Sequence, residues 1–226
     1  MPDADALVVG GVAPLSTCDW PGRLVVTVFC QGCPWDCTYC HNPDLIDPRL
    51  AGRVPWSRVR ELLARRQGLI DGVVFSGGEP TRQPALLSAV REVREAGFAV
   101  GLHTSGAYPR RLSEVLPLVD WVGLDVKSPA ARYDAVTRVA ASADRAFASL
   151  RLVLEAGVAV QVRTTVDPTT LSPDDVSDLG ETLRAMGVID HVLQEARTAG
   201  VRPEYRAALG AARRNGSPNR QITGRK

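Results

Sequence analysis

Strand-like and helix-like patterns alternate along most of this 226-residue chain, and that alternation constrains its fold more than any other feature. Short runs rich in β-branched residues predict strands over Leu24–Phe29, Val73–Ser76, Ala99–Thr104, Trp121–Val126, Ala159–Val166 and His191–Glu195. Amphipathic patterns between them predict helices over Trp56–Arg66, Pro84–Ala96, Arg110–Leu116, Asp144–Ala156 and Pro173–Met186. Because alternating strands and helices favour right-handed crossovers, we predict an α/β fold with a parallel sheet, either doubly wound or a partial barrel.

Local signals set the ends of several predicted helices. Ser172 is a good N-cap for the helix that begins at Pro173. Gly97, Gly157 and Gly187 stand where three helices should end, because glycine adopts the left-handed conformation common at that position.

Composition narrows the function classes. The net charge is only +2, from 27 basic and 25 acidic residues, which gives no general electrostatic case for nucleic-acid binding. The longest apolar runs are strand-sized, so we expect no membrane span. The first residues lack the basic start of a secretory signal, and we expect a soluble cytoplasmic protein.

We expect one main domain with two flanking segments. Residues 1–22 form an N-terminal entry segment, residues 23–200 the α/β body, and residues 201–226 a C-terminal helix with a flexible basic tail. Six basic and no acidic residues follow Glu204, and Asn215-Gly216-Ser217-Pro218 interrupts them. A solvated tail explains this composition better than a nucleic-acid-binding arm does.

Four of the five cysteines lie in Cys30-Gln-Gly-Cys33-Pro-Trp-Asp-Cys37-Thr-Tyr-Cys40-His-Asn, directly after the first predicted strand. We call residues 30–42 the cysteine loop. Clustered thiols in a cytoplasmic chain indicate a metal site rather than disulfides. Zinc is one alternative, but only three residues separate the two Cys-x2-Cys pairs, whereas structural zinc sites use a much longer spacer. An iron–sulfur cluster suits several thiolates on one short loop better.

Polar residues also stand at the ends of the following predicted strands, where barrel enzymes place their chemistry. The segment Ser76-Gly77-Gly78-Glu79-Pro80 combines glycines, which let the backbone approach a ligand, with a carboxylate. Asp125-Val126-Lys127 ends the fourth predicted strand. Lys127 is one of only two lysines among the 27 basic residues, and lysine and arginine are not interchangeable at a tight site.

The spacing Cys33-x3-Cys37-x2-Cys40 resembles the signature of the radical S-adenosylmethionine (SAM) superfamily. This resemblance implies a partial (β/α)6 TIM-like barrel with the cluster loop after its first strand. It also implies a 4Fe–4S cluster held by these three cysteines, with SAM chelating the fourth iron. Reductive cleavage of SAM would then release a 5′-deoxyadenosyl radical that abstracts hydrogen. Tyr39 matches the aromatic that contacts adenine.

Other motifs resemble those of glycyl-radical enzyme activating enzymes. Gly77-Gly78-Glu79-Pro80 matches the motif that grips the methionine amino group, and Thr104, Asp125 and Lys127 match strand-end segments of the pocket. Arg163 and Gln194 lie on the strands whose polar side chains meet the ribose and carboxylate. His103 departs from the pattern, since an aspartate usually stands there, and this puts a cation site near SAM in doubt. Cys30 is expected to be a small core residue, His191 is expected to be structural, and Cys18 is given no role.

Two further segments resemble one subgroup, the anaerobic ribonucleoside-triphosphate reductase activating proteins. Cys40-His41-Asn42-Pro43 also occurs in pyruvate formate-lyase activating enzymes, and Pro14–Arg23 resembles the subgroup's entry segment. The resemblance implies abstraction of a glycine Cα hydrogen in a partner glycyl-radical enzyme, with flavodoxin or ferredoxin as reductant and neither membrane nor nucleic acid as partner. The alternatives are a radical SAM enzyme that acts on a small molecule, such as 7-carboxy-7-deazaguanine synthase, and a non-catalytic zinc module.

Overall fold

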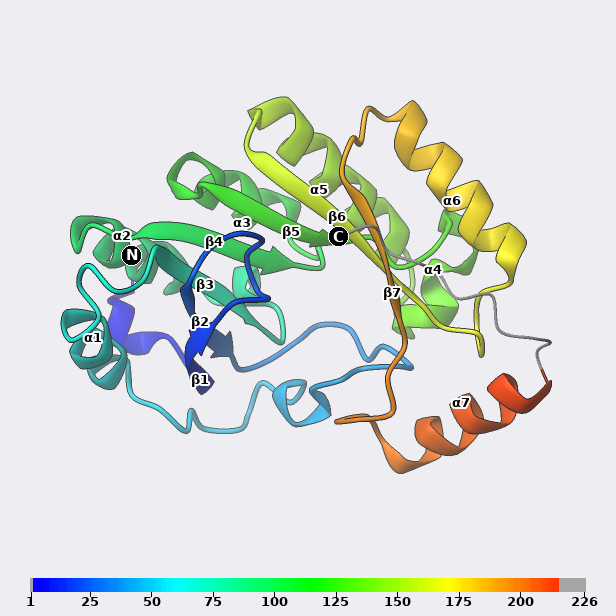
Figure 1. The fold of residues 1–226 in the computed structure, drawn as a ribbon, viewed down its shortest axis with the longest axis horizontal. Helices are drawn as coiled ribbons and strands as arrows, with labels where there is room; N and C mark the ends of the chain where they lie inside the picture. The colour runs from blue at the N-terminus through cyan, green and yellow to red at the C-terminus, as the bar shows by residue number, and fades with distance from the viewer. Residues whose placement is uncertain (1, 216–226) are drawn as a thin grey trace.

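The computed structural model describes residues 2–215 of the chain. Its strands form one sheet in sequential order (Figure 1). They are β1 (Val9–Ser16), β2 (Val25–Cys30), β3 (Gly72–Gly77), β4 (Ala99–Thr104), β5 (Trp121–Asp125), β6 (Ala159–Val166) and β7 (His191–Glu195). Strands β2 to β7 are parallel, as predicted, whereas β1 pairs antiparallel with β2.

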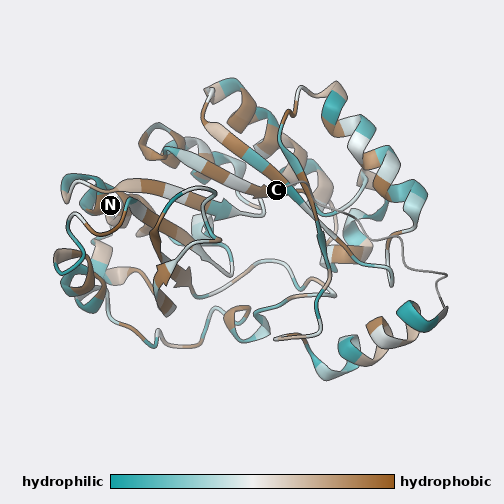
Figure 2. Ribbon diagram, viewed as in Figure 1, coloured by the Kyte–Doolittle hydropathy of each residue, from teal (hydrophilic) through white to brown (hydrophobic). Residues whose placement is uncertain are grey.

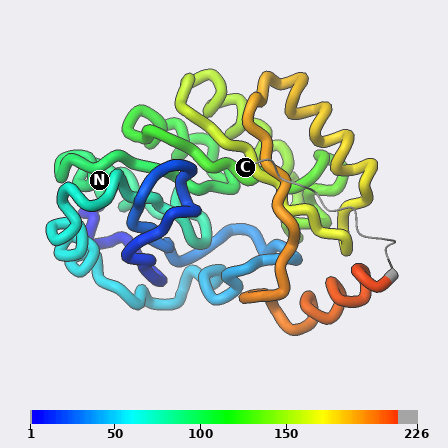
Figure 3. The backbone as a smooth tube through the Cα atoms, viewed as in Figure 1, coloured from blue at the N-terminus to red at the C-terminus, as the bar shows by residue number. Residues whose placement is uncertain are grey.

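The helices are α1 (Trp56–Ala64), α2 (Leu86–Glu95), α3 (Pro109–Val115), α4 (Ala130–Thr137), α5 (Ser142–Ala156), α6 (Pro173–Ala185) and α7 (Pro203–Asn215). Figure 1 shows α1 to α6 along the outer side of the curved sheet, with α7 apart from them beyond the lower end of β7. Strands β1 and β7 are the two edges of the sheet, so the barrel is partial (Figure 3). Within residues 2–215, no helix has the length and apolar character needed to cross a membrane.

The main core lies between the sheet and its outer helices. In Figure 2 the strands are largely hydrophobic, while the helices alternate between hydrophobic and hydrophilic faces. Trp56 of α1 stacks on Phe75 of β3 with ring centroids 6.1 Å apart, and both side chains are fully buried. Burial of such side chains is the main favourable term in folding, and it fixes the strand ends in one register.

The predicted helix ends are confirmed. Ser172 caps α6 in a capping box with Asp175: its hydroxyl accepts from the Asp175 amide, and the Asp175 carboxylate accepts from the Ser172 amide. Gly97, Gly157 and Gly187 all have positive φ angles, as helix-ending glycines should.

Two elements were missed in the sequence. Strand β1 contains Gly10, Gly11 and Pro14, residues that are unfavourable within a sheet but tolerated in an edge strand. Helix α4 is short, and its C-cap is Arg138 in the left-handed conformation rather than a glycine, so no helix-ending signal marked it. The entry segment therefore contributes a strand to the main sheet.

The rest of the entry segment covers the inner face of the sheet. Trp20 stacks on Trp121 of β5 at 5.6 Å between ring centroids. A Cβ on Gly101 of β4 would lie 2.9 Å from the Trp20 ring, so a bare backbone is needed for this contact. Helix α7 supplies the expected C-terminal helix, and the predicted tail beyond residue 215 lies outside the described residues.

Candidate active site

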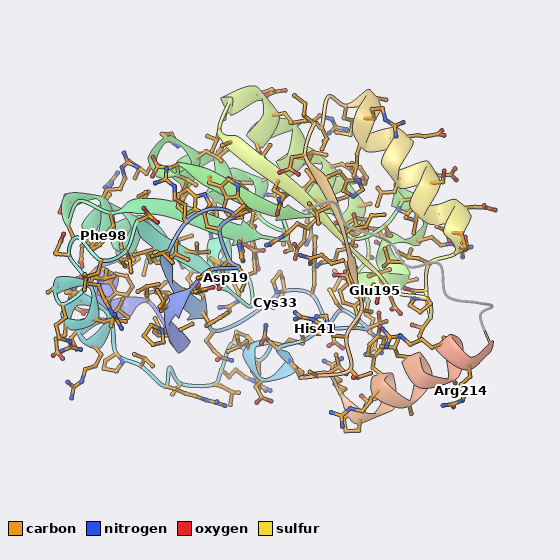
Figure 4. All side chains as sticks on the ribbon, viewed as in Figure 1. Asp19, Cys33, His41, Phe98, Glu195 and Arg214 are labelled. Atoms are coloured by element: carbon orange, nitrogen blue, oxygen red, sulfur yellow. The ribbon has the colours of Figure 1, made fainter. Side chains whose placement is uncertain are left out.

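A cavity of about 670 Å³ opens where the parallel strands end. The labelled residues Asp19, Cys33, His41 and Glu195 lie around it in Figure 4. All predicted site residues but one line this cavity: Cys33, Cys37, Tyr39, Cys40, Gly77, Gly78, Thr104, Asp125, Lys127, Arg163 and Gln194. The exception is Glu79. Residues predicted from six separate stretches of sequence thus converge on one place.

Glycines dock the cysteine loop onto the end of β3. The Gly78 amide donates to the Cys30 carbonyl and the Glu79 amide to the Gly32 carbonyl, both at 2.9 Å. A Cβ on Gly78 would lie 2.5 Å from the Gly32 carbonyl oxygen, and one on Gly77 would lie 2.4 Å from the Cys30 nitrogen. These backbones approach too closely for any side chain, which explains the two successive glycines.

Burial dominates the chemistry of the three loop thiols. It raises the pKa of Cys33, Cys37 and Cys40 above the ordinary thiol value, while the Lys127 charge acts in the opposite direction on each. Metal ligands of this kind are thiolates, so binding of a metal at these buried thiols would require their deprotonation.

The other two cysteines differ from these three. Cys30 is fully buried in the main core, as expected for a small apolar residue. Cys18 is exposed, lines the cavity from the entry segment, and lies 3.5 Å from the Ser16 hydroxyl.

Lys127 lines the cavity from just beyond the end of β5. Its side chain is only 8% exposed, and its Nζ lies 3.6 Å from Asp125 Oδ2 and 5.7 Å from the centroid of the Tyr39 ring. Burial alone would lower the pKa of Lys127, but Tyr39, Cys37 and Asp125 together raise it well above the ordinary lysine value. A protonated amine thus stands beside the cysteine loop.

Arg163 of β6 forms the second cation of this wall. Its Nη2 lies 3.1 Å from Asp125 Oδ1, and its side chain is 12% exposed. Burial would raise the pKa of Asp125, but Arg163 and Lys127 outweigh burial and lower it. A carboxylate held between two cations remains ionised.

His103 stands where the resemblance described above predicts an aspartate. Its Nε2 lies 2.7 Å from the Asp19 carbonyl oxygen and 3.1 Å from Nη1 of Arg163. Its Nδ1 lies 3.1 Å from the Ser76 hydroxyl. Burial, with Arg163 nearby, lowers the pKa of His103 to about 4. His103 therefore contributes a neutral imidazole at the position where an aspartate was expected. The cation next to Asp125 is the guanidinium of Arg163.

Glu79 lies behind the cavity wall rather than in it. Its side chain is fully buried, and its two oxygens accept from Thr81, Thr104 and Ser105. The shortest of these bonds, from the Ser105 hydroxyl, measures 2.5 Å. With both oxygens occupied, this carboxylate ties the β3 end to the β4 end, which differs from the expected direct contact with the methionine amino group.

The C-terminal segment (residues 196–215) packs against the outer side of the cysteine loop. Tyr39, 5% exposed, belongs to a small hydrophobic cluster with Tyr205 and Leu209 of α7. Arg202 pairs with Asp36, the residue before Cys37. The segment therefore supports the predicted adenine-binding aromatic from behind.

Some cavity residues were not predicted as site residues. Asp19, His41, Glu195 and Arg197 all line the cavity. Asp19 belongs to the segment Pro14–Arg23, and His41 belongs to Cys40-His41-Asn42-Pro43. These two motifs were the sequence signal that could have identified Asp19 and His41 as site residues.

A model of the radical SAM superfamily matches residues 27–186, most of the chain. The chain belongs to the radical SAM superfamily. Its members use a 4Fe–4S cluster and S-adenosylmethionine, so this chain is a radical SAM enzyme.

Three relatives of known name have sequences similar to this chain. A Methanocaldococcus jannaschii protein provisionally named a glycyl-radical enzyme activating enzyme is 29% identical over 185 residues, 78% of this chain and 75% of the relative. The pyruvate formate-lyase-activating enzyme of Clostridium pasteurianum is 29% identical over 191 residues, which cover 81% of this chain and 79% of that enzyme. The 7-carboxy-7-deazaguanine synthase of Thermococcus kodakarensis is 28% identical over 169 residues, 66% of each chain.

Solved structures of radical SAM enzymes share the fold. SuiB of Streptococcus suis bound to S-adenosylmethionine superimposes with a TM-score of 0.59 at 14% identity. The match covers 74% of this chain but only 39% of SuiB, so it bears on the partial barrel alone.

The residues present fit a cubane cluster better than a single metal ion. Within residues 2–215, no three His, Cys, Asp or Glu side chains are grouped closely enough to hold one ion. Zinc requires such a grouping, with ligands about 2.0–2.3 Å from one point. A 4Fe–4S cluster instead takes each thiolate on a different iron, which suits three thiols spread along one loop. The match to the radical SAM superfamily, whose members use a 4Fe–4S cluster, therefore decides against the zinc alternative.

Proposed function

We propose that this enzyme activates a glycyl-radical enzyme by abstracting a Cα hydrogen from one glycine of its partner. The observation that supports this most is the cavity itself. It joins the three signature cysteines to the polar ends of five strands, in a barrel left open between β1 and β7. Two relatives that each match over three quarters of this chain carry the names of activating enzymes.

Cys33, Cys37 and Cys40 would hold the 4Fe–4S cluster. When bound, the cluster supplies the electron that cleaves S-adenosylmethionine into methionine and the hydrogen-abstracting 5′-deoxyadenosyl radical. The loop backbone, docked on Gly77 and Gly78, fixes the thiols relative to the strand ends.

The remaining cavity residues would bind and orient S-adenosylmethionine. Lys127 and Arg163 supply positive charge next to the methionine carboxylate, and Tyr39 offers an aromatic face to adenine. Thr104 and Gln194 supply polar contacts at the ends of β4 and β7. In our proposal Glu79 acts indirectly, because it positions Thr104 and Ser105.

Glycine suits this reaction because its Cα carries no side chain that would block the attacking radical. A partial barrel offers an open side through which a loop of a partner protein can reach the cavity. The partner we propose is the anaerobic ribonucleoside-triphosphate reductase, on the resemblance of Pro14–Arg23 to the entry segment of its activating proteins. Flavodoxin or ferredoxin would be the reductant. All five thiols are free, which agrees with a reducing compartment such as the cytoplasm.

The test mixes the anaerobically reconstituted enzyme with the reductase from the same source, S-adenosylmethionine and dithionite. We expect a glycyl-radical doublet in the electron paramagnetic resonance spectrum, and none with the Cys37→Ala variant. Formation of 5′-deoxyadenosine without a doublet on the reductase would reject this partner and leave the radical SAM assignment in place.

A second candidate function rests on the relative named 7-carboxy-7-deazaguanine synthase, whose identity is nearly as high over a shorter match. In that case the cavity would take a small molecule rather than a protein loop. Formation of 7-carboxy-7-deazaguanine would support this second function, whereas a glycyl-radical doublet on a partner protein would support the first.

A further inference from the structure

A second depression adjoins the cavity on the outer side of the cysteine loop. It has a volume of about 680 Å³ and lies between the start of β1, residues 41–45 and residues 200–203. His41 and Asn42 line both it and the main cavity. We call this depression the β1 groove. The two spaces are therefore neighbours that share a wall, and a chain lying in the groove could continue into the cavity.

The floor of the β1 groove is made of bare backbone. Gly10 and Gly11 line it together with Phe29 of β2. A Cβ on Gly11 would have no atom within 4 Å, and Gly11 does not adopt a positive φ. Nothing in the local fold therefore requires glycine at this position. Its effect is to leave the groove open where a side chain would fill it.

Strand β1 also presents an unused edge beside this groove. On its outer side, Val9 accepts from the amides of Arg53 and Val54, which closes the start of the strand. Among residues 2–215, no strand pairs with the outer edge from Gly10 to Ser16. Free backbone groups on a sheet edge pair readily with an extended peptide, and adjacent side-chain-free positions let its backbone approach.

The groove walls suit a polypeptide better than a single small polar ligand. Arg53 is 68% exposed and pairs only loosely with Asp44, at 3.9 Å, so it remains available to a peptide carbonyl or an acidic side chain. Phe29, which is half-buried, adds apolar surface, and Leu45 and Val201 are buried residues of the groove lining. This mixture of exposed polar groups and apolar patches beside a free strand edge is typical of peptide-binding grooves.

We propose that the β1 groove binds an extended segment of the partner protein next to the glycine that reacts. This proposal rests on the proposed function, since it assumes that a protein segment enters the cavity. The segment would lie along β1, pass over Gly10 and Gly11, and turn into the cavity at His41 and Asn42. Specificity for the partner thus depends on a surface that is separate from the residues around S-adenosylmethionine.

Gly11→Leu tests the proposal, because it fills the groove from a position with open space around it. Gly180→Leu on α6 is the matched control, since a Cβ there also meets nothing within 4 Å. Each variant is compared with the wild type in iron content, in 5′-deoxyadenosine formed with dithionite alone, and in the glycyl-radical doublet as the partner concentration is varied. Gly11→Ala, a smaller change, checks that the effect grows with side-chain size.

We expect Gly11→Leu to raise the partner concentration for half-maximal activation by about tenfold or more, with iron content and partner-free cleavage unchanged. Gly11→Ala should have a smaller effect and Gly180→Leu none. Wild-type activation at unchanged partner concentration in Gly11→Leu would overturn the groove proposal while leaving the proposed function intact. Absence of a doublet with the wild type itself would reject the reductase as the partner, and with it the binding of a reductase segment in the β1 groove.

Discussion

The two sides of the active-site cavity are built in different ways. One side, the strand-end wall, consists of Thr104, Asp125, Lys127, Arg163 and Gln194, which follow from the register of four neighbouring parallel strands. The other side is the cysteine loop, which has no regular secondary structure across its three thiols. Sheet hydrogen bonds position the wall, whereas the loop depends on contacts with segments far away in the sequence.

Those contacts hold the cysteine loop from two directions. The β3 end grips it through Gly77 and Gly78. On the other side, the amides of Asp36 and Thr38 donate to carbonyls at the end of α4, at 3.0 Å each, and the C-terminal segment packs behind Tyr39. We therefore expect single substitutions at the loop contacts to lower the iron content of the enzyme. Single substitutions in the strand-end wall should instead lower the affinity for S-adenosylmethionine and leave the iron content unchanged.

The largest expected effect is at the β3 contact. In Gly78→Ala, the added methyl would overlap the Gly32 and Leu45 carbonyl oxygens at 2.5 and 2.7 Å, both backbone atoms that cannot rotate away. We expect a loss of about 2 kcal/mol or more in the free energy of unfolding and a clear loss of iron after reconstitution. Urea unfolding and iron analysis measure the two.

The control for that variant is Gly180→Ala on α6, where the new methyl meets nothing within 4 Å. It should be neutral or stabilise by up to about 1 kcal/mol, since alanine is the better helix former. Equal iron content in the two variants would show that the β3 contact does not hold the loop.

The next effect belongs to the strand-end wall. Lys127→Arg keeps the charge but puts a planar fork in a site that is 8% exposed and next to Asp125 and two aromatic rings. We expect the affinity for S-adenosylmethionine to fall by about tenfold, measured by isothermal titration, with iron content unchanged. Loss of the cluster instead would place Lys127 among the loop supports and erase the distinction between the two sides.

A smaller effect is expected at the outer side of the loop. Arg202→Met removes the partner of Asp36 but keeps most of the apolar length of the side chain. The pair is partly exposed, so we expect a loss of about 1 kcal/mol and faster release of iron to a chelator. Arg206→Met, an exposed change in the same C-terminal segment, should release iron at the wild-type rate. Identical rates of iron release for both variants would show that the pairing of Arg202 with Asp36 does not help to hold the cysteine loop.

The last effect appears only in acid, as a pH dependence that originates in His103 beside the strand-end wall. His103 has a pKa of about 4 in the folded protein, below its ordinary value of 6.5, because burial and Arg163 disfavour its charged form. The unfolded chain therefore binds a proton between pH 6.5 and 4 that the folded chain does not. Stability is lost as pH falls through this window, by at most about 1.4 kcal/mol per pH unit from this group. Urea unfolding across the window should give a shallower slope for His103→Gln than for the wild type, and equal slopes would contradict this origin.

The sequence was sufficient to predict the wall. Strand patterns marked where each parallel strand ends, and the carboxyl ends of parallel strands meet at one edge, so Asp125 and Lys127 could be placed there. The family resemblance was needed to single out Arg163, which lies within its predicted strand. The spacing of Cys33, Cys37 and Cys40 indicated a cluster for a different reason, because ligands close in sequence on one loop are also close in space.

What holds the loop was not predictable in the same way. The pairing of Arg202 with Asp36 joins residues 166 positions apart and leaves no periodic pattern. Glu79 matched a ligand-binding motif, yet its oxygens are taken up by Thr81, Thr104 and Ser105. Such contacts depend on how two chain segments cross, which neither local propensity nor motif spacing specifies.

The most direct test of the central claim compares the cluster in three proteins: the wild type, Cys37→Ala and Cys30→Ala. Each is reconstituted without oxygen, reduced with dithionite and examined by electron paramagnetic resonance with and without S-adenosylmethionine. We expect a reduced 4Fe–4S signal that changes when S-adenosylmethionine binds in the wild type and in Cys30→Ala, and no such cluster in Cys37→Ala. A signal that survives in Cys37→Ala but vanishes in Cys30→Ala, or that ignores S-adenosylmethionine in the wild type, would contradict this expectation.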